Sequence, residues 1–338
     1  MHAMIGTSVI LGLFLGLLPL PAHARENTES LKGTVALSGA WALYPMAVKW
    51  AEVFREIHPG VRIDIGAGGA GKGMADCLTG TVDIGMVSRD IYPEEIKKGA
   101  WWIAVAKDAV VPTMNASNPL AAEILARGIS REIFTGMWIT GDITTWEQAA
   151  GADGNGKHDI HVYTRSDACG AAKTWAKYLG WNQEDLLDVG VYGDPGLATA
   201  VINDQLGAGF NNINYAYDAK TKITVSGIRI LPIDLNENGR LDKDEDFYGD
   251  RDQIVAAIAD GRYPSPPARD LFFVSRGCPE KPAVRAFIQW VLTEGQGYVQ
   301  ESGYIPVPQD KLREGLNRLR QETLAGTCTG GFASLWSE

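Results

Sequence analysis

The sequence has too few basic residues to balance its acidic ones. It contains 31 Lys and Arg against 41 Asp and Glu, for a formal net charge of -10. This balance argues against nucleic acid or an anionic membrane as a partner. It does not exclude a small anion, because an anion site is built from local donors rather than from net charge. The sequence also lacks internal repeats and low-complexity tracts.

Charged side chains are absent from residues 1–24, which contain the apolar run Ile5–Leu20 and then the small residues of AHA, ending at Ala24. This pattern is typical of a secretory signal peptide, although the segment before the run lacks Lys and Arg. The run is short for a membrane span. No L-x-x-C lipobox follows, and no later apolar segment reaches spanning length. We therefore expect cleavage near Ala24 and a protein that is periplasmic or secreted.

Cysteine is scarce, with four residues in the whole chain, at positions 77, 169, 278 and 328. In an exported protein, four cysteines can form two disulfides in three possible pairings. We favour a bond between Cys278 and Cys328, and we expect Cys169 to be free.

A hydroxyl is missing from the glycine-rich segment GAGGAGKG, residues 66–73. The segment matches G-x-x-x-x-G-K, but Gly73 occupies the position where a P-loop has the Ser or Thr that coordinates magnesium. ATP is also scarce outside the cytoplasm. The alternatives to a nucleotide site are another kind of anion-binding loop and a simple glycine-rich turn.

Strand and helix signals alternate along the chain. Strand patterns at residues 33–40, 61–66 and 81–90 are separated by helical patterns at 44–60 and 72–80, and a further strand, turn and helix cover residues 158–181. This alternation predicts an α/β fold with doubly wound sheets and flanking helices. In such sheets ligands bind beyond the carboxyl ends of the strands, where helix N-termini point.

Seven segments carry a resemblance to a known family: SGAWALYPMAVKWAE, GAGGAGKGM, GTVDIGMVSRD, AVVPTMNASNP, IFTGMWITGDITTW, RSDACGAAKTWAKYLG and EGQGYVQESGYIPVP. In this order they resemble the periplasmic phosphate-binding (PstS-like) proteins of ABC importers, which have the type II periplasmic binding protein fold. The resemblance implies a discontinuous lobe of residues 31–114 plus 271–338, a second lobe of residues 115–270, and a ligand cleft between them. It also implies a small oxyanion ligand, phosphate or an analogue, and an ABC permease as partner. We expect a monomer that is not an enzyme.

The resemblance implies that four turns hold the ligand. Their residues are Ala40, Trp41, Ala42, Gly69, Ala70, Gly71, Ser88, Arg89, Arg165, Asp167, Cys169, Gly170 and Ala171. In the family, main-chain N–H groups at helix N-termini, hydroxyls and one Arg bind the anion, and an Asp often accepts its proton.

The sequence departs from the family pattern at the hydroxyl positions, which here are Ala40, Trp41, Ala42, Ala70, Cys169 and Ala171. The family's Asp acceptor is also absent from the position of Ser88. Each lost hydrogen bond removes about 1 kcal/mol or more of binding free energy. Two interpretations therefore remain open. The chain either captures phosphate or a related small oxyanion for an importer, or it has left phosphate transport and acts as an extracellular sensor or interaction module, for which a thiophilic or organic anion is a candidate ligand.

Four residues of this set also have alternative interpretations. Arg165 and Asp167 could form an ion pair that stabilises their turn, and Trp41 could be a core or lobe-interface residue or a cleft wall. Cys169 could be a small buried residue. Alternatively, a thiol at a helix N-terminus near Arg165 would have a lowered pKa and could meet a thiophilic anion or a redox partner.

Residues 234–245, DLNENGRLDKDE, match an EF-hand-type calcium loop. The ligand positions are filled by Asp234, Asn236, Asn238, the Arg240 carbonyl, Asp242 and Glu245, with Gly239 at the sharp turn. Oxygen ligands at this spacing suit Ca²⁺ because its coordination shell is large and flexible. A single loop of this kind predicts a structural ion rather than a sensor.

Overall fold

The computed structural model of the chain describes residues 31–152 and 156–324. The predicted signal peptide and Cys328 lie outside these residues, so the cleavage site and the Cys278–Cys328 bond stay predictions. Within the described ranges, no helix is both long and apolar enough to cross a membrane.

The described residues pack around two hydrophobic cores within one compact unit. We call the part around the first core the first lobe and the part around the second core the second lobe. Trp50, Phe273 and Phe287 lie in the first core, and Trp138 and Trp175 lie in the second. Both cores are rich in aromatic rings that meet at steep angles, such as Trp138 and Trp175 at 81°.

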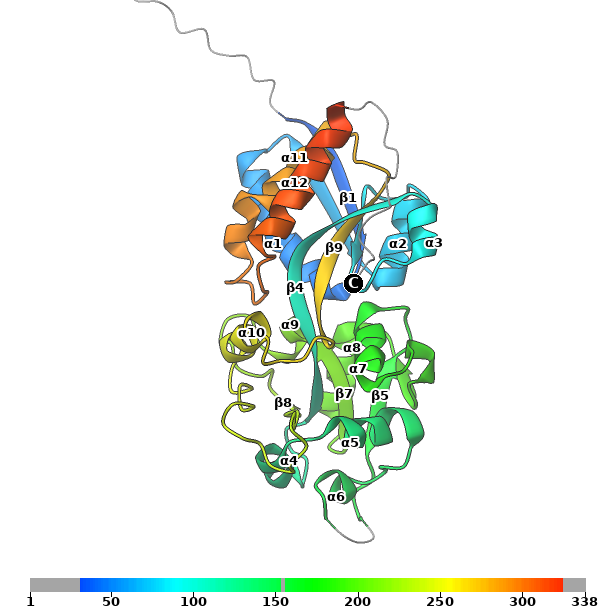
Figure 1. Ribbon diagram of the computed structural model, residues 1–338, viewed down its shortest axis with the longest axis vertical. Helices are drawn as coiled ribbons and strands as arrows, with labels where there is room; N and C mark the ends of the chain where they lie inside the picture. The colour runs from blue at the N-terminus through cyan, green and yellow to red at the C-terminus, as the bar shows by residue number, and fades with distance from the viewer. Residues whose placement is uncertain (1–30, 153–155, 325–338) are drawn as a thin grey trace, which may run out of the picture. The chain divides into compact units, whose positions relative to one another are not determined.

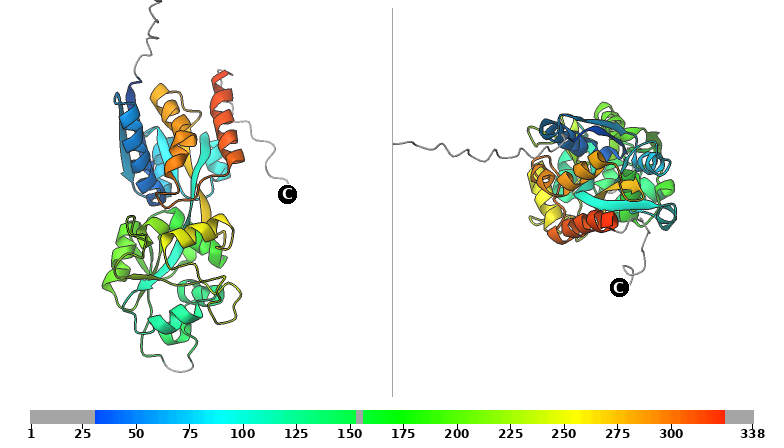
Figure 2. Two further views of the ribbon diagram at one scale, coloured as in Figure 1. Left: turned by 90° about the vertical axis from the view of Figure 1, so that its left-hand side faces the viewer. Right: turned by 90° about the horizontal axis from the view of Figure 1, so that it is seen from above.

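The first lobe is a sheet covered by helices on both faces (Figure 1). Its strands are β1 (Gly33–Gly39), β2 (Val61–Ala67) and β3 (Ile84–Val87). Its helices are η1 (Trp41–Leu43), α1 (Tyr44–Ile57), α2 (Ala70–Leu78), α3 (Pro93–Lys97), α11 (Pro282–Leu292), η4 (Glu294–Tyr298) and α12 (Gln309–Leu324). Helices α1, α11 and α12 lie on one face, and α2 and α3 lie on the other (Figures 1 and 2).

The second lobe repeats this layered arrangement. Its strands are β5 (His161–Arg165), β6 (Val189–Val191), β7 (Gly207–Asn212) and β8 (Ile228–Ile230). Its helices are α4 (Ala121–Arg127), α5 (Arg131–Thr135), the π-helix η2 (Gly136–Thr140), α6 (Trp146–Ala149), α7 (Gly170–Leu179), η3 (Gln183–Asp185), α8 (Gly193–Asn203), α9 (Ile213–Ala216) and α10 (Arg251–Ala259).

Two long strands, β4 (Ala100–Asn115) and β9 (Ala268–Arg276), connect the lobes. The strand order is β2-β1-β3-β9-β4-β7-β5-β6, with β8 on β4. Strands β1, β2 and β3 are parallel, as are β5, β6 and β7, whereas β4 and β9 pair antiparallel with each other and with their neighbours. The predicted α/β fold with two doubly wound lobes is therefore confirmed.

The passage between lobes along β4 differs from the predicted boundary after Met114. On this strand Ala106 belongs to the first core, whereas Ala109 and Met114 belong to the second. The strand β4 continues without a break through both lobes, and Lys107 and Asp108 interrupt its apolar pattern between the two cores.

Candidate anion-binding site

Four turns predicted to hold the ligand meet where the two lobes touch. The turns after β1, β2 and β3 lie at one edge of the first lobe, because parallel strands end at the same edge of a sheet. The turn between β5 and α7 approaches them from the second lobe. There the Gly71 N–H, in the first turn of α2, donates to the Ala168 carbonyl at 2.9 Å.

Two glycines allow this close approach. Gly69, the N-cap of α2, has a φ of +91°, a conformation that residues with a Cβ rarely adopt. A Cβ on Gly170, the first residue of α7, would lie 2.1 Å from the Ser88 carbonyl oxygen and 2.2 Å from its Oγ. Side chains at these two positions would therefore hold the turns apart.

Arg165 lies at the centre of these turns and is fully buried. Its Nε and Nη2 donate to the two Asp167 carboxylate oxygens at 2.7 Å each, and its Nη1 donates to Asp194 Oδ2 at 2.6 Å. Asp194 also accepts from the Asn212 N–H through Oδ1 at 3.0 Å. The ion pair between Arg165 and Asp167 that the sequence allowed is thus present, and a second carboxylate joins it.

The first turn of α7 carries N–H groups that have no acceptor in the described part of the chain. Ala172 N–H donates to Cys169 Sγ at 3.4 Å, and Lys173 N–H donates to the Cys169 carbonyl. Gly170 and Ala171 N–H donate to no group within the described ranges. Free N–H groups at a helix N-terminus beside a guanidinium are a suitable environment for an anion.

Comparisons with known proteins agree with this geometry. Residues 24–294 match the family model of the PBP superfamily domain. The phosphate-binding protein PstS of Bacillus subtilis is 30% identical over 213 residues, covering 62% of this chain and 67% of the relative. The chain belongs to the PstS-like family.

Another relative, protein SphX of Synechococcus elongatus, is 26% identical over 341 residues, covering 93% of this chain and 91% of the relative. Among solved structures, a candidate phosphate ABC transporter substrate-binding protein with bound phosphate from Clostridium perfringens superposes with a TM-score of 0.65. It is 20% identical, and the match covers 82% of this chain and all of that one. These likenesses agree with the type II periplasmic binding protein fold.

Alanine side chains fill four of the six hydroxyl positions where this PstS-like chain departs from its family. Ala40, Ala42, Ala70 and Ala171 are all buried, with 2% or less of their surface exposed. None of them can bind an anion through a side chain, so only their main-chain groups are available. The polar contacts at these positions are therefore those of the backbone.

Trp41 packs across the junction between the lobes. Its ring lies 6.3 Å from that of Tyr44 in its own lobe and 6.4 Å from that of Tyr192 in the other. Its carbonyl accepts from the Tyr215 hydroxyl at 3.1 Å. Its indole N–H is buried and has no partner within the described residues. Trp41 is therefore a lobe-interface residue, which is one of the alternatives that the sequence left open.

The predicted low pKa of Cys169 is wrong. Burial raises the pKa of this thiol to about 11, and the opposing effect of the nearby Arg165 charge is smaller. Cys169 is free, as expected, and acts as the N-cap of α7. No Cys/His pair forms within the described residues, since His158 contacts Glu147 and His161 contacts Asp204, each at 2.7 Å.

Arg89 is directed away from the other predicted ligands. Its guanidinium donates to both Glu95 carboxylate oxygens, at 2.7 and 3.0 Å, and lies 4.2 Å from the centre of the Tyr92 ring. The preceding residue, Ser88, is buried against Gly170. Ser88 and Arg89, which follow β3, therefore contact different groups.

Asp194 is the site residue that the sequence did not reveal. It is the second residue of α8 and is fully buried. The only sequence signal is an acidic residue in a first helical turn, which usually indicates a favourable interaction with the helix dipole. Its contact with Arg165 joins two segments 29 residues apart.

The predicted calcium loop forms a compact turn with two buried carboxylates, on Asp234 and Glu245. Gly239 N–H donates to Asp234 Oδ2 at 2.8 Å, and Leu235 and Asn236 N–H donate to Glu245 Oε1 at 2.9 and 3.0 Å. Neither carboxylate has an ion-pair partner within the described ranges. Those ranges also contain no cluster of three or more His, Cys, Asp and Glu side chains in a metal-binding arrangement. The donor set is nevertheless all oxygen, which suits Ca²⁺.

Proposed function

We propose that this chain captures phosphate or a related oxyanion between its lobes and delivers it to the permease of an ABC importer. The observation that carries the proposal is the pair of N–H groups on Gly170 and Ala171, which donate to no acceptor within the described residues and directly follow Cys169, a residue close to the Arg165 charge. The Bacillus subtilis relative, a phosphate-binding protein, supports phosphate as the ligand. We further propose that the protein is exported after cleavage near Ala24. It would act in transport as a monomer and would have no enzymatic activity.

Ligand entry would require the lobes to separate, because the turns are in direct contact. The Ala168 carbonyl occupies the Gly71 N–H, and the Asp167 Oδ2 lies 2.8 Å from where a Gly69 Cβ would be. An anion that enters would take over the Gly71 N–H and add the free donors of α7. Charge-assisted hydrogen bonds of this kind contribute about 1.5–3 kcal/mol each.

The charge of the site favours an anion that carries protons. Arg165 supplies one positive charge, and Asp167 and Asp194 supply two negative charges. A carboxylate can accept a hydrogen bond from a protonated phosphate or arsenate, but it repels sulfate, which has no proton to donate near neutral pH. No observation within the described residues favours the alternative role as a sensor.

Titration calorimetry with phosphate, arsenate and sulfate tests this proposal. The protein is first unfolded and refolded so that no co-purified ligand remains. We expect phosphate and arsenate to bind, and sulfate to bind at least tenfold more weakly. The absence of binding heat for all three anions, together with an unchanged melting temperature, would reject the proposal.

We also propose that residues 234–245 hold one structural Ca²⁺. Asp234, Asn236, Asn238, Asp242 and Glu245 would supply side-chain oxygens and Arg240 its carbonyl. The support is the burial of two carboxylates, each 3% exposed, that only neutral N–H groups contact within the described part of the chain. Buried carboxylates without a cation are costly unless a metal or a protein cation compensates them.

A further inference from the structure

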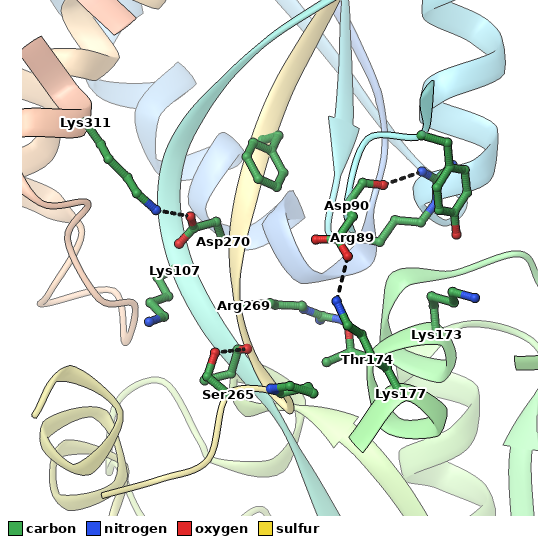
Figure 3. A pocket seen from close by; sticks show the side chains of 14 residues that line it. Arg89, Asp90, Lys107, Lys173, Thr174, Lys177, Ser265, Arg269, Asp270 and Lys311 are labelled. Atoms are coloured by element: carbon green, nitrogen blue, oxygen red, sulfur yellow. Dashed lines mark hydrogen bonds and ion pairs between the residues drawn. The ribbon is translucent and has the colours of Figure 1, made fainter. Parts of the chain in front are cut away.

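A cavity of about 310 Å³ lies beside the two strands that connect the lobes (Figure 3). We call it the hinge pocket. Its walls come from the turn after β3, from α7, from β4 and β9, from the loop before β9, and from Lys311 of α12. Of the predicted anion ligands, only Arg89 lines it. Its volume falls at the lower end of the ~300–1,000 Å³ typical of small-molecule sites.

The hinge pocket is strongly basic, although the chain has a net charge of -10. Six cationic side chains line it: Arg89, Lys107, Lys173, Lys177, Arg269 and Lys311. Two carboxylates, Asp90 and Asp270, line it as well. A basic concave site in an acidic protein focuses a positive potential and attracts anions.

Two of the cations form fixed parts of the wall. Arg269 Nε donates to Asp108 Oδ1 at 3.0 Å, and its Nη1 donates to Thr174 Oγ1 at 3.0 Å. Arg89 is held by Glu95, as described above. These arginines are at most 11% exposed, so they shape the pocket rather than move within it.

Two lysines form ion pairs that can rearrange. Lys177 Nζ lies 2.8 Å from Asp90 Oδ2, and Lys311 Nζ lies 2.6 Å from Asp270 Oδ2. Both lysines are about half exposed, and exposed pairs of this kind contribute little to stability. Their ammonium groups are therefore available to an anion in the pocket (Figure 3).

Lys107 and Lys173 contact no carboxylate within the described residues. Lys173 Nζ donates to the neutral Asn182 Oδ1 at 3.2 Å. Six cations in and around the pocket thus face four carboxylates, counting Glu95 and Asp108 behind the arginines. The surplus of two positive charges lies inside a defined cavity rather than on an open surface.

We propose that the hinge pocket is a second anion site and that it binds a condensed phosphate such as pyrophosphate. Four lysine ammonium groups are strongly hydrated point charges, which suit phosphate oxygens. Lys107 and Lys311 lie on one side of β4 and β9, and Lys173 and Lys177 lie on the other (Figure 3), so an elongated anion with charge at both ends would be contacted from both walls of the pocket. A nucleotide fits less well, because Arg89 already covers the Tyr92 ring on which a base would stack.

Occupancy of the hinge pocket would favour contact between the lobes. Asp90 belongs to the first lobe and Lys177 to the second, so their ion pair already crosses the junction. Helix α7 carries Lys173 and Lys177 and begins at Gly170, beside Arg165. A ligand of the hinge pocket would therefore hold the same helix whose N-terminus faces the first anion site.

Calorimetry with pyrophosphate tests the inference on the mature chain, both without orthophosphate and with a saturating amount of it. We expect pyrophosphate to bind in both cases, and more weakly as the salt concentration rises. In the variant Lys107→Gln/Lys173→Gln, pyrophosphate affinity should fall at least tenfold, while orthophosphate affinity changes less than twofold. The matched control Lys32→Gln/Lys98→Gln removes two exposed lysines outside the pocket and should leave both affinities unchanged.

Four outcomes would overturn the inference. They are the absence of pyrophosphate binding, its complete loss when orthophosphate saturates the protein, full binding by the Lys107→Gln/Lys173→Gln variant, and equal or tighter binding of citrate. The loss under saturating orthophosphate would assign pyrophosphate to the first site. The hinge pocket can bind pyrophosphate even if orthophosphate never binds at Arg165, so the two proposals fail separately.

Discussion

The Arg165 guanidinium donates to Asp194 at 2.6 Å, and both side chains are completely buried. Asp167 binds the same guanidinium through both of its oxygens. Two carboxylates therefore neutralise and outnumber the one cation that an incoming anion would meet. The balance at this site depends on Asp194, which approaches from α8 rather than from the turn that carries Arg165.

Replacing Asp194 by Asn should strengthen phosphate binding. The substitution keeps the shape of the side chain and removes one negative charge near the ligand. At about 6–8 Å and an effective dielectric constant near 20, such a charge costs roughly 2–3 kcal/mol. Even when half of this is lost to screening, phosphate affinity measured by calorimetry should rise about tenfold.

The same variant should be less stable by about 1–3 kcal/mol in urea unfolding, because a buried charge-assisted hydrogen bond is lost. Asp142→Asn removes an exposed charge and serves as the control for both measurements. Weaker phosphate binding in Asp194→Asn would mean that Asp194 acts mainly by orienting Arg165, and the electrostatic argument would then be wrong.

Replacing Gly170 by Ala should prevent the lobes from closing. The new Cβ would lie 2.1 Å from the Ser88 carbonyl oxygen, a contact that only a separation of the turns can relieve. We expect the radius of gyration in small-angle X-ray scattering to increase and phosphate affinity to fall at least tenfold.

Gly297→Ala is the matched control, because a Cβ at Gly297 would meet no atom within 4 Å. It should change neither the scattering curve nor phosphate binding. An unchanged radius of gyration in Gly170→Ala, with normal affinity, would show that the close approach at Ser88 is unnecessary for the ligand-bound state.

Most strands and helices of the first lobe could be predicted from the local sequence, because the strand and helix signals follow one another along the chain without conflict. The pattern of β1, Pro45 at the start of α1, and the apolar strand β3 each lie where expected. Helix α2 begins at Ala70, two residues before the expected start, because Gly69 is its N-cap. Glycine is a stronger signal for the end of a helix than for its start, which explains the difference.

The side-chain contacts of the candidate site were harder to predict from the sequence. The turns could be identified from the family resemblance, but the contact between Arg165 and Asp194 depends on how α8 packs on β5. The direction of Arg89 likewise depends on Glu95, which lies six residues later in α3. The lowered pKa expected for Cys169 was wrong because the effect of burial, which no short motif reveals, outweighs the effect of the Arg165 charge.

Cys169 should be unreactive in the folded protein. With a pKa of about 11, roughly one thiol in a thousand is ionised at pH 8. Mass spectrometry after iodoacetamide treatment at pH 8 should find Cys169 unmodified in native protein and modified after unfolding in urea. Rapid modification of the native protein would contradict the burial of this thiol.

The raised pKa of Cys169 makes the free energy of unfolding depend on pH. The unfolded thiol ionises near pH 8.5 and the folded thiol near 11, so the unfolded chain binds fewer protons in this interval. The free energy of unfolding should therefore fall as the pH rises through it. Cys169→Ala should reduce this slope, and an unchanged slope would assign the effect to other groups such as Cys77, whose pKa burial also raises to about 11.

Calcium should stabilise the second lobe through residues 234–245. Chelation with EGTA should lower the melting temperature by several degrees, since a ligand at a hundred times its Kd contributes about 2.7 kcal/mol. In Asp234→Ala the melting temperature should already be low and should no longer respond to EGTA. The physical reason is that Asp234 is 3% exposed and would supply the first ligand of the loop.

Asp244→Ala is the matched control for this experiment. Asp244 belongs to the same loop but is exposed and does not occupy a ligand position. This variant should keep the full response to EGTA. If wild type, Asp234→Ala and Asp244→Ala all melt at the same temperature with and without EGTA, the loop binds no calcium. Its buried carboxylates would then be held by the N–H groups of Leu235, Asn236 and Gly239 alone.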